Sequence, residues 1–137
     1  MKVHTTNYVN TFIEIAEDSK NQSAVKPEPK AGKPTIASMQ FEMLYGHPYK
    51  YSSDDVLFTV FADRQEIPES EREEARQIFF SKGQACFRAS PLTKQFGWGV
   101  HCNAEGKIAL CPAGSTEYQQ WLTDANTARV KAMKSGS

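Results

Sequence analysis

The stretch Trp98-Gly-Val-His-Cys-Asn-Ala-Glu-Gly-Lys-Ile-Ala-Leu-Cys-Pro112 carries the strongest folding signal in this chain. Its centre, Asn103-Ala104-Glu105-Gly106, has asparagine at the first position of a type I turn and glycine at the fourth, where each is favoured. A type I turn followed by a glycine in the left-handed region closes a three-residue hairpin loop with a bulge. The sequence therefore predicts a hairpin in which Cys102 pairs with Ile108.

This register sorts the side chains of the hairpin onto two faces, because successive residues of a strand point to opposite sides. His101 and Cys111 fall together on one face, where Gly97 and Gly99 leave the strand bare of side chains. A bare strand admits the close approach of a ligand, or of a packed helix that needs the space. The opposite face collects the apolar side chains Trp98, Val100, Cys102, Ile108 and Leu110.

Outside the hairpin, hydrophobic spacing and helix-capping residues predict the other elements. Ser52 and Asp55 have the spacing of a capping box, which indicates a helix start, and Ser115 is placed as the N-cap of a last helix. The segment 19–33 is rich in lysine and proline, so we expect a flexible loop there. We expect strands in 8–18 and 85–90, helices in 35–45, 52–64, 68–82 and 115–133, and a connecting loop at 91–96.

These elements predict an α+β fold, with a small, mainly antiparallel sheet and about four helices packed chiefly on one face. We expect a single domain over residues 1–134 and a disordered tail at 135–137. The predicted core comprises Leu57, Phe61, Ile78, Phe79, Phe87, Trp98, Val100, Ile108, Leu110, Trp121 and Leu122.

Composition limits the classes of function. The 137 residues include 16 Lys and Arg against 16 Asp and Glu, so the formal net charge is zero, which disfavours nucleic-acid or anionic-membrane partners. No apolar stretch approaches the ~20 residues of a membrane span, and the N-terminus lacks the pattern of a signal peptide. The three cysteines show no C-x-x-C spacing, so we expect a reduced cytoplasmic protein without a metal site or cofactor. The oligomeric state stays open.

A candidate site follows from the segment Ala85–Ser90. If Phe87 points into the core, alternation directs Cys86, Arg88 and Ser90 away from it, and a neighbouring hairpin would add His101. The absence of a catalytic motif favours a non-enzymatic binding or interaction module, with a small anionic or peptide ligand or a protein partner. The expected ligand-binding residues are Arg88, Ser90, Lys94 and His101.

Two other functions remain open. One is a thiol-dependent enzyme with Cys86 and His101 as candidate catalytic residues, since a nearby imidazole and an arginine would activate a thiol. The other is binding of a nucleotide or single-stranded nucleic acid, because Phe87, Phe96 and Trp98 are interleaved with basic residues.

Four strings together resemble a small bacterial protein family known only as a domain of unknown function. They are HTTNYVNTFIEIAED (4–18), HPYKYSSDDVLFTVFADR (47–64), IPESEREEARQIFFSKGQACFRASPLTKQFGWGVH (67–101) and NAEGKIAL (103–110). The resemblance extends from His4 to about Met133 and implies a stand-alone cytosolic domain, without supplying an activity, cofactor or catalytic residue. Cys102 and Cys111 depart from the family pattern, which leaves Cys86 as the candidate for thiol chemistry.

Overall fold

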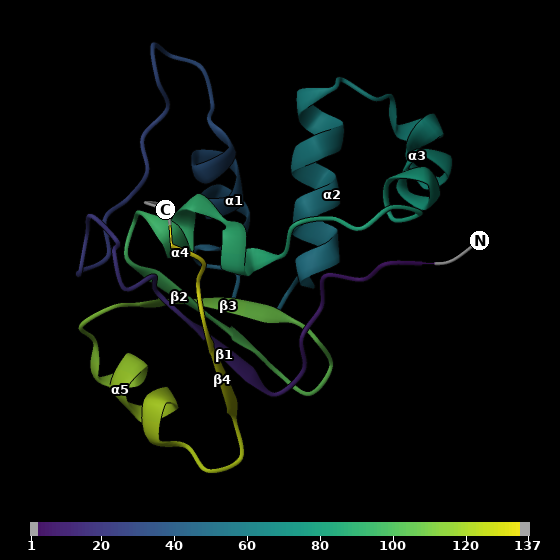
Figure 1. The fold of residues 1–137 in the computed structure, drawn as a ribbon. Coiled ribbons are helices and arrows are strands. Elements are labelled where there is room, and N and C mark those ends of the chain that lie inside the picture. The colour runs from purple at the N-terminus through teal and green to yellow at the C-terminus, as the bar shows by residue number, and fades with distance from the viewer. Residues whose placement is uncertain (1–2, 135–137) are drawn as a thin grey trace.

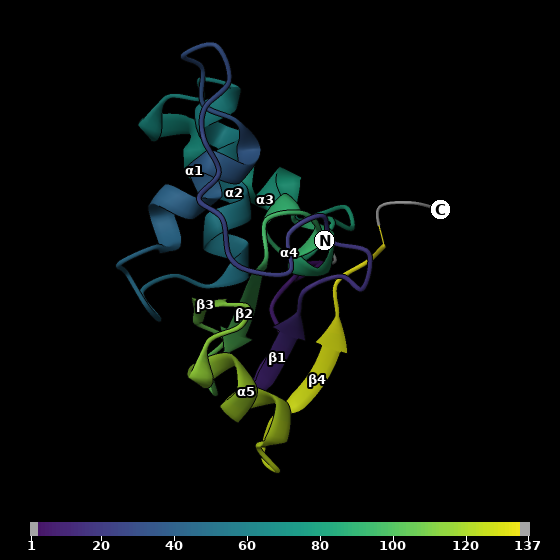
Figure 2. The same ribbon diagram turned by 90° about the vertical axis from the view of Figure 1, so that its left-hand side faces the viewer.

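The computed structural model describes residues 3–134 and shows an α+β fold built on one four-stranded sheet, in the order β3-β2-β1-β4 (Figure 1). Four helices gather on one side of the sheet and a fifth lies on the other side (Figure 2). The strands are β1 (Thr11–Glu14), β2 (Trp98–Cys102), β3 (Ile108–Pro112) and β4 (Ala128–Lys131). The helices are α1 (Ile36–Leu44), α2 (Ser53–Arg64), α3 (Arg72–Phe79), α4 (Pro91–Lys94) and α5 (Thr116–Thr123).

The hairpin of β2 and β3 has the register that its turn predicted. Cys102 pairs with Ile108, and Gly99 pairs with Cys111. The Asn103 side chain accepts the backbone N–H groups of Glu105 and Lys107 at 3.0 and 2.8 Å, and Gly106 has a φ of 76°. This closed turn fixes the face that each side chain of the hairpin takes. The apolar face, with Trp98, Val100, Cys102 and Ile108, lies in the main core beneath α1 and α2.

The helix expected over 115–133 is wrong in its second half. Ser115 caps α5 as expected, but the helix ends at Thr123 and the chain returns as β4, parallel to β1. The backbone N–H groups of Ala128 and Ala132 donate to Asn10 and Glu14 carbonyls at 2.9 Å each. The alanines favour a helix locally, but pairing with the otherwise open edge of β1 outweighs that preference.

The strand expected at 85–90 is also wrong. Residues Phe87–Ala89 form a single 3₁₀ turn, η2, and the expected connecting loop at 91–96 contains the short helix α4. Ser90 caps α4 by accepting the N–H of Leu92 at 3.1 Å, and Pro91 occupies the first turn. The Thr93 hydroxyl then donates to the Phe87 carbonyl at 2.6 Å, so helix capping replaces sheet pairing here.

Among the helices that cover the main core, α2 begins after its predicted cap and ends at Arg64 as expected, whereas α3 is shorter than expected. Ser52 and Asp55 form both bonds of the capping box of α2. The helix expected over 68–82 starts with a 3₁₀ turn, Glu69–Glu71, and ends at Phe79. Ile78 is 57% exposed and Phe61 36% exposed, so both are wrong as core residues. Only one face of α3 meets α2, which leaves Ile78 on the open side.

The lysine- and proline-rich segment 19–33 contains no helix or strand, but part of it is held against β2. The Val25 N–H donates to the Phe96 carbonyl, and the Trp98 indole N–H donates to the Val25 carbonyl, both at 2.9 Å. Gly97 is required beneath this contact, because a Cβ there would lie 2.3 Å from the Ser23 carbonyl oxygen. The tail expected at 135–137 lies outside the described residues. Within residues 3–134, no helix has the length and apolar character to cross a membrane.

Candidate functional site

His101 lies on the α5 side of the sheet and is already engaged by neighbouring rings. Its ring stacks on Trp121 with centroids 3.6 Å apart, and its Nδ1 lies 2.9 Å from the Tyr49 hydroxyl. Burial lowers the pKa of His101, against the opposing charges of Asp124 and Glu117. The imidazole is therefore neutral near pH 7, which removes the charge that an anion would need.

The bare strand face beside His101 is filled from within the molecule. A Cβ added to Gly99 would lie 2.8 Å from both the Phe12 ring and the Tyr118 ring. These two rings meet edge to face, 4.9 Å apart, beneath α5. Gly99 thus provides space for packing, and no ligand could approach the strand at this point.

Cys86 lies on the other side of the sheet from His101. Its Sγ is 3.8 Å from the Tyr8 hydroxyl, and Tyr8 packs against the main core that contains Cys102. His101 and Cys102 are successive residues of β2, so their side chains point to opposite faces. The structure therefore does not bring the two candidate catalytic residues, Cys86 and His101, together.

The other expected ligand-binding residues do not converge on His101 either. Arg88 donates from Nε to the Lys131 carbonyl at 2.7 Å, which ties the η2 turn to β4. Ser90 is buried, and its hydroxyl donates to Gln40 Oε1 at 2.6 Å. Lys94 ends α4 on the helical side of the sheet. The expected set fails to assemble because 85–90 is a turn and not a strand beside the hairpin.

A groove that sequence reasoning missed lies at the outer edge of β3, and we call it the β3-edge groove. It has a volume of about 430 Å³. Its walls come from the end of α1, the turn that follows, β3 and the first turn of α5. The residues that matter for its chemistry are Tyr45, Pro48, Tyr49, Trp98, Leu110, Pro112 and Glu117.

Two tyrosines give this groove its exposed aromatic surface. Tyr45 is 59% exposed, yet its ring stacks on Phe41 at 4.8 Å and meets the Trp98 ring at 5.9 Å. Tyr49 is 38% exposed and has a φ of 60°, a left-handed conformation that is strained for a tyrosine. The Tyr49 ring packs edge to face on His101 at 5.7 Å, so both tyrosine rings contact other rings while part of each faces solvent.

The backbone of Leu110 is open at the groove. The N–H of Asn103 donates to the Lys107 carbonyl, and the N–H of Ala113 donates to the Gly97 carbonyl. The backbone N–H and carbonyl groups of the odd-numbered residues of β3 therefore point toward β2. The backbone groups of the even-numbered residues point away from β2. At Ile108 the carbonyl accepts the Tyr49 N–H and the N–H donates to the Tyr51 carbonyl. Next along the strand, Leu110 has no such partner among residues 3–134 for its N–H and carbonyl. This residue is an unpaired strand edge, which can accept an extended peptide.

The charge at the groove is negative. Glu117 is the only charged residue that lines it in the described part of the chain. Burial raises the pKa of Tyr49, and the nearby Glu117 carboxylate adds to this effect, so the phenol stays neutral. Within residues 3–134, no group of three His, Cys, Asp or Glu side chains could hold a metal ion. The groove therefore offers aromatic, anionic and hydrogen-bonding surface, and no cationic group.

One local signal in the sequence could have pointed to this groove. The string Tyr45-Gly-His-Pro-Tyr49 places two aromatic residues in a turn, where the chain has little reason to bury them. Which strand edge they flank depends on long-range packing, which no local pattern encodes.

The fold and the groove define the class: an α+β domain with an aromatic groove at one sheet edge. Residues 3–137 match a family described as a family of unknown function (DUF6157), and the chain belongs to that family. No curated protein matches this chain, and no solved structure does.

Proposed function

We propose that this protein is a non-enzymatic, cytoplasmic binding module that holds a short basic, proline-containing peptide in the β3-edge groove. The observation that carries this proposal is the pair of exposed tyrosines, Tyr45 and Tyr49, beside the open backbone of Leu110. The cytoplasmic setting is supported by the free thiols, since none of the three cysteines is paired.

The open edge of β3 would supply the main-chain contacts. The N–H and carbonyl of Leu110 can form two hydrogen bonds with one residue of an extended peptide. Pairing cannot continue past Leu110, because Pro112 has no N–H and its carbonyl already accepts bonds from Ser115 at 3.2 and 2.7 Å. The peptide must therefore gain the rest of its affinity from side chains.

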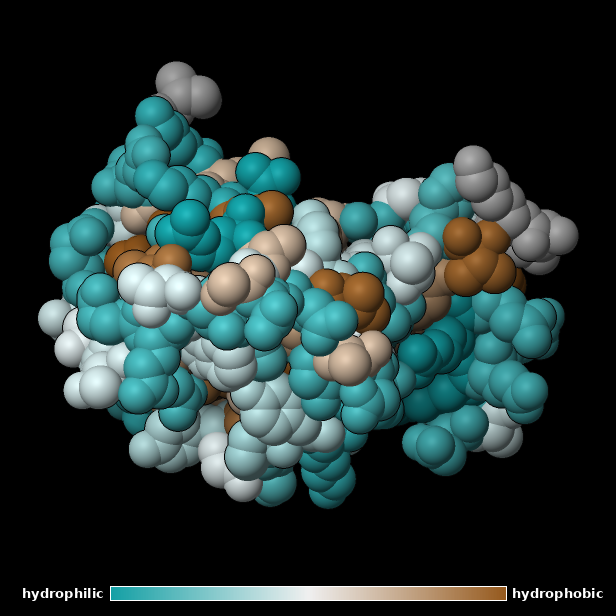
Figure 3. Space-filling model, turned by 90° about the horizontal axis from the view of Figure 1, so that it is seen from below, coloured by the Kyte–Doolittle hydropathy of each residue, from teal (hydrophilic) through white to brown (hydrophobic). Residues whose placement is uncertain are grey.

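The aromatic walls favour proline and lysine in those side-chain positions. Proline rings pack on tyrosine faces, and a proline-rich peptide loses little conformational entropy because it is already extended. A lysine ammonium gains from the faces of Tyr45 and Tyr49 and from the carboxylate of Glu117. The face seen from below in Figure 3 is largely hydrophilic, with apolar residues in small patches.

Binding of a fluorescent peptide, Lys-Pro-Pro-Lys-Pro-Pro-Lys, would test the proposal by fluorescence anisotropy at low salt. We expect Tyr45→Ala to weaken binding about tenfold, as removal of an aromatic anchor does. Phe61→Ala is the matched control, because Phe61 is also a partly exposed aromatic residue but lies outside the groove. Circular dichroism would verify that both variants fold.

The same assay with Glu-Pro-Pro-Glu-Pro-Pro-Glu tests the role of charge. We expect this peptide to bind more weakly than the lysine peptide, and Glu117→Gln to reduce the difference. Equal binding of the two peptides, or equal losses from Tyr45→Ala and Phe61→Ala, would reject the groove as the binding site.

The other functions have less support from the geometry. An anionic ligand would need Arg88 and His101 together, but Arg88 is bonded to the Lys131 carbonyl of β4 and His101 stacks on Trp121 of α5. The Cys86 thiol contacts the Tyr8 hydroxyl, and no histidine within residues 3–134 is bonded to it for thiol catalysis. For nucleic-acid binding, Phe87 and Trp98 would have to stack on bases, yet both are buried in the core.

A further inference from the structure

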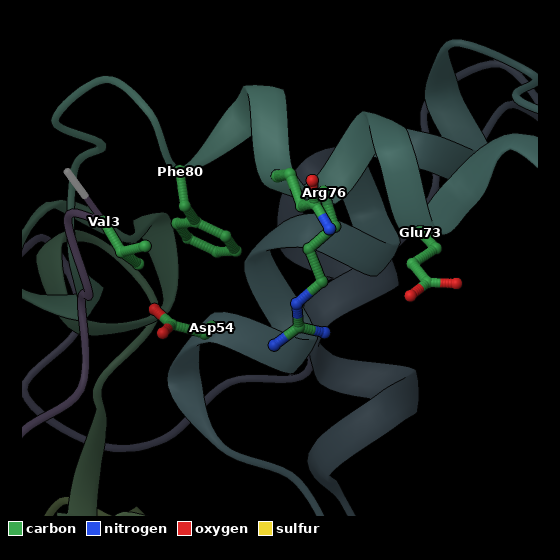
Figure 4. Close-up of a pocket in the computed structure, with 6 residues that line it drawn as sticks. Val3, Asp54, Glu73, Arg76 and Phe80 are labelled. Carbon is green, nitrogen blue, oxygen red and sulfur yellow. The ribbon is translucent and has the colours of Figure 1, made fainter. Parts of the chain in front are cut away.

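Cavities among the helices differ in whether their polar groups already have partners. One cavity of about 540 Å³ lies between α3, the first turn of α2 and the N-terminal segment (Figure 4). Asp54 accepts three hydrogen bonds there from Thr5 and Thr6. Arg76 pairs with Asp55 at 3.0 Å. The Asp54 and Arg76 charges are thus matched within the chain, and neither is left to hold a ligand.

A smaller cavity, which we call the α1–α2 cavity, lies between α1, α2 and the end of α3. Its volume is about 230 Å³, more than the ~150 Å³ that suffices to hold a benzene ring. Most of its wall is apolar and comes from Ile36, Leu57, Val60, Phe61 and Phe79. Its polar side chains are Gln40, Arg64, Gln65 and Gln84, and no acidic side chain within residues 3–134 lines it.

Gln40 brings an unused hydrogen-bond donor to this cavity. Its side chain is 3% exposed, and its Oε1 accepts the Ser90 hydroxyl at 2.6 Å. The Ser90 oxygen itself accepts the Leu92 N–H at 3.1 Å, so the serine proton goes to Gln40 and the Gln40 Nε2 is left over. This amide nitrogen has no hydrogen-bond partner within residues 3–134. A buried donor without a partner costs free energy, which an acceptor on a ligand recovers.

The free amide of Gln40 is in contact with the cavity. Among the side-chain nitrogens and oxygens of residues 3–134, only Trp121 Nε1 is both fully enclosed and without a partner. Gln40 Nε2 also lacks a partner, so it is not fully enclosed, and the space that it meets is the cavity that Gln40 lines.

Arg64 adds a positive charge that no carboxylate neutralises. It is the last residue of α2 and is exposed. The preceding acid, Asp63, pairs with Arg72 at 2.9 Å, and Arg64 forms no ion pair within residues 3–134. Arg64 also lines an adjoining cavity, together with Lys30, Lys33 and a single glutamate. The local charge is therefore positive.

Gln40 and Arg64 belong to helices that pack side by side (Figure 1). Gln40 follows Ile36 by one turn on α1, and Arg64 follows Val60 by one turn on α2, and all four line the cavity. Gln40 and Val60 are buried whereas Ile36 and Arg64 are exposed, so the cavity opens at Arg64 and ends at Gln40. One helical turn is about 5.4 Å, which an arginine side chain can span.

We infer that the α1–α2 cavity binds a small aromatic carboxylate, held by the Gln40 amide and the Arg64 guanidinium. Each oxygen of the carboxylate accepts from one of these donors. The ring of the ligand packs against Phe61 and Phe79, whose ring centroids lie 4.7 Å apart. An alcohol of the same shape lacks the charge that matches Arg64, and an amine meets a like charge. This site is separate from the peptide proposal, because none of its residues lines the β3-edge groove.

The probes are benzoate, benzyl alcohol and benzylamine, titrated into the ¹⁵N-labelled full chain at pH 7 and low salt. We expect benzoate to shift the side-chain amide resonances of Gln40 and the backbone amides of Leu57 and Phe79. We expect it to bind about tenfold tighter than benzyl alcohol. Equal shifts with benzyl alcohol or benzylamine, or an unmoved Gln40 side-chain amide, would overturn the inference.

Arg64→Gln removes the charge at an exposed helix end, with little risk to folding. We expect it to weaken benzoate binding about fivefold, the upper range for an exposed ion pair. Arg129→Gln is the matched control, because Arg129 is also exposed and forms no ion pair within residues 3–134 but lies on β4. Equal losses in the two variants would mean that benzoate responds to general surface charge and would overturn the site.

Discussion

The three cysteines illustrate how surroundings decide the chemistry of one residue type. Burial raises the pKa of Cys102 and of Cys111 to about 12 in each case. Both thiols are therefore protonated at any ordinary pH, and they behave as small core residues. Cys86 is partly exposed beside Tyr8.

Alkylation with iodoacetamide at pH 8 should therefore modify Cys86 and spare the other two while the chain is folded. Peptide mass spectrometry would locate the label, and the same reaction in guanidinium should reach all three thiols. Cys86→Ser should leave the folded chain unlabelled. Label on folded Cys102 or Cys111 would contradict their burial, and an unreactive Cys86 would count against any thiol-dependent activity.

Gly99 shows that the absence of a side chain can be a packing requirement. We expect Gly99→Ala to lower the free energy of unfolding by about 1–3 kcal/mol, because its methyl group must displace the Phe12 and Tyr118 rings. Urea denaturation would measure the change. Gly83→Ala is the control, since a Cβ there meets nothing within 4 Å. A Gly99→Ala chain as stable as the control would mean that the rings move aside freely.

At the scale of elements, local signals predicted some structures and long-range contacts decided others. The hairpin turn and the capping box of Ser52 are short in sequence, so their residues specify them directly. The turn at 87–89 and strand β4 depend on Ser90 meeting Gln40 and on β4 meeting β1. The ligand site expected from the sequence around Arg88 and His101 failed for the same reason, because it required a strand at 85–90 beside the hairpin and that strand does not form.

A pair of proline substitutions tests the assignment of β4. The N–H groups of Ala128 and Ala132 donate to β1, so alternation also directs the Val130 N–H to β1 and the Arg129 N–H to solvent. We expect Val130→Pro to destabilise the chain by about 2–3 kcal/mol and Arg129→Pro by much less, as measured by urea denaturation. A helix over 115–133 would instead be broken equally by both substitutions.

At the scale of the whole molecule, β1 and β2 are covered on both faces and organise everything else. The main core packs on one face, and the cluster of Phe12, Cys111, Ala113 and Tyr118 packs on the other. His101 and Cys102 are neighbours along β2, so their side chains point to opposite faces of the sheet: His101 to the face covered by α5, and Cys102 to the face covered by α1 and α2. Sequence reasoning predicted helices chiefly on one face, which α1 to α4 confirm, but it did not predict that α5 covers the other face. It also did not predict the groove, which combines segments distant in the chain.

The stability of the whole chain should depend on pH through His101. Burial lowers the pKa of this imidazole from its ordinary value of 6.5, so below that pH the unfolded chain binds a proton that the folded chain resists. We expect the contribution of His101 to the free energy of unfolding to be complete above about pH 6.5. This contribution is lost as the pH falls from there through the lower pKa that His101 has in the folded state. His101→Phe keeps a ring against Trp121 but cannot titrate, so its urea midpoint should change less between pH 7 and 5. His47→Gln, at an exposed histidine, should keep the wild-type slope, and an unchanged slope in His101→Phe would assign the pH dependence to other groups.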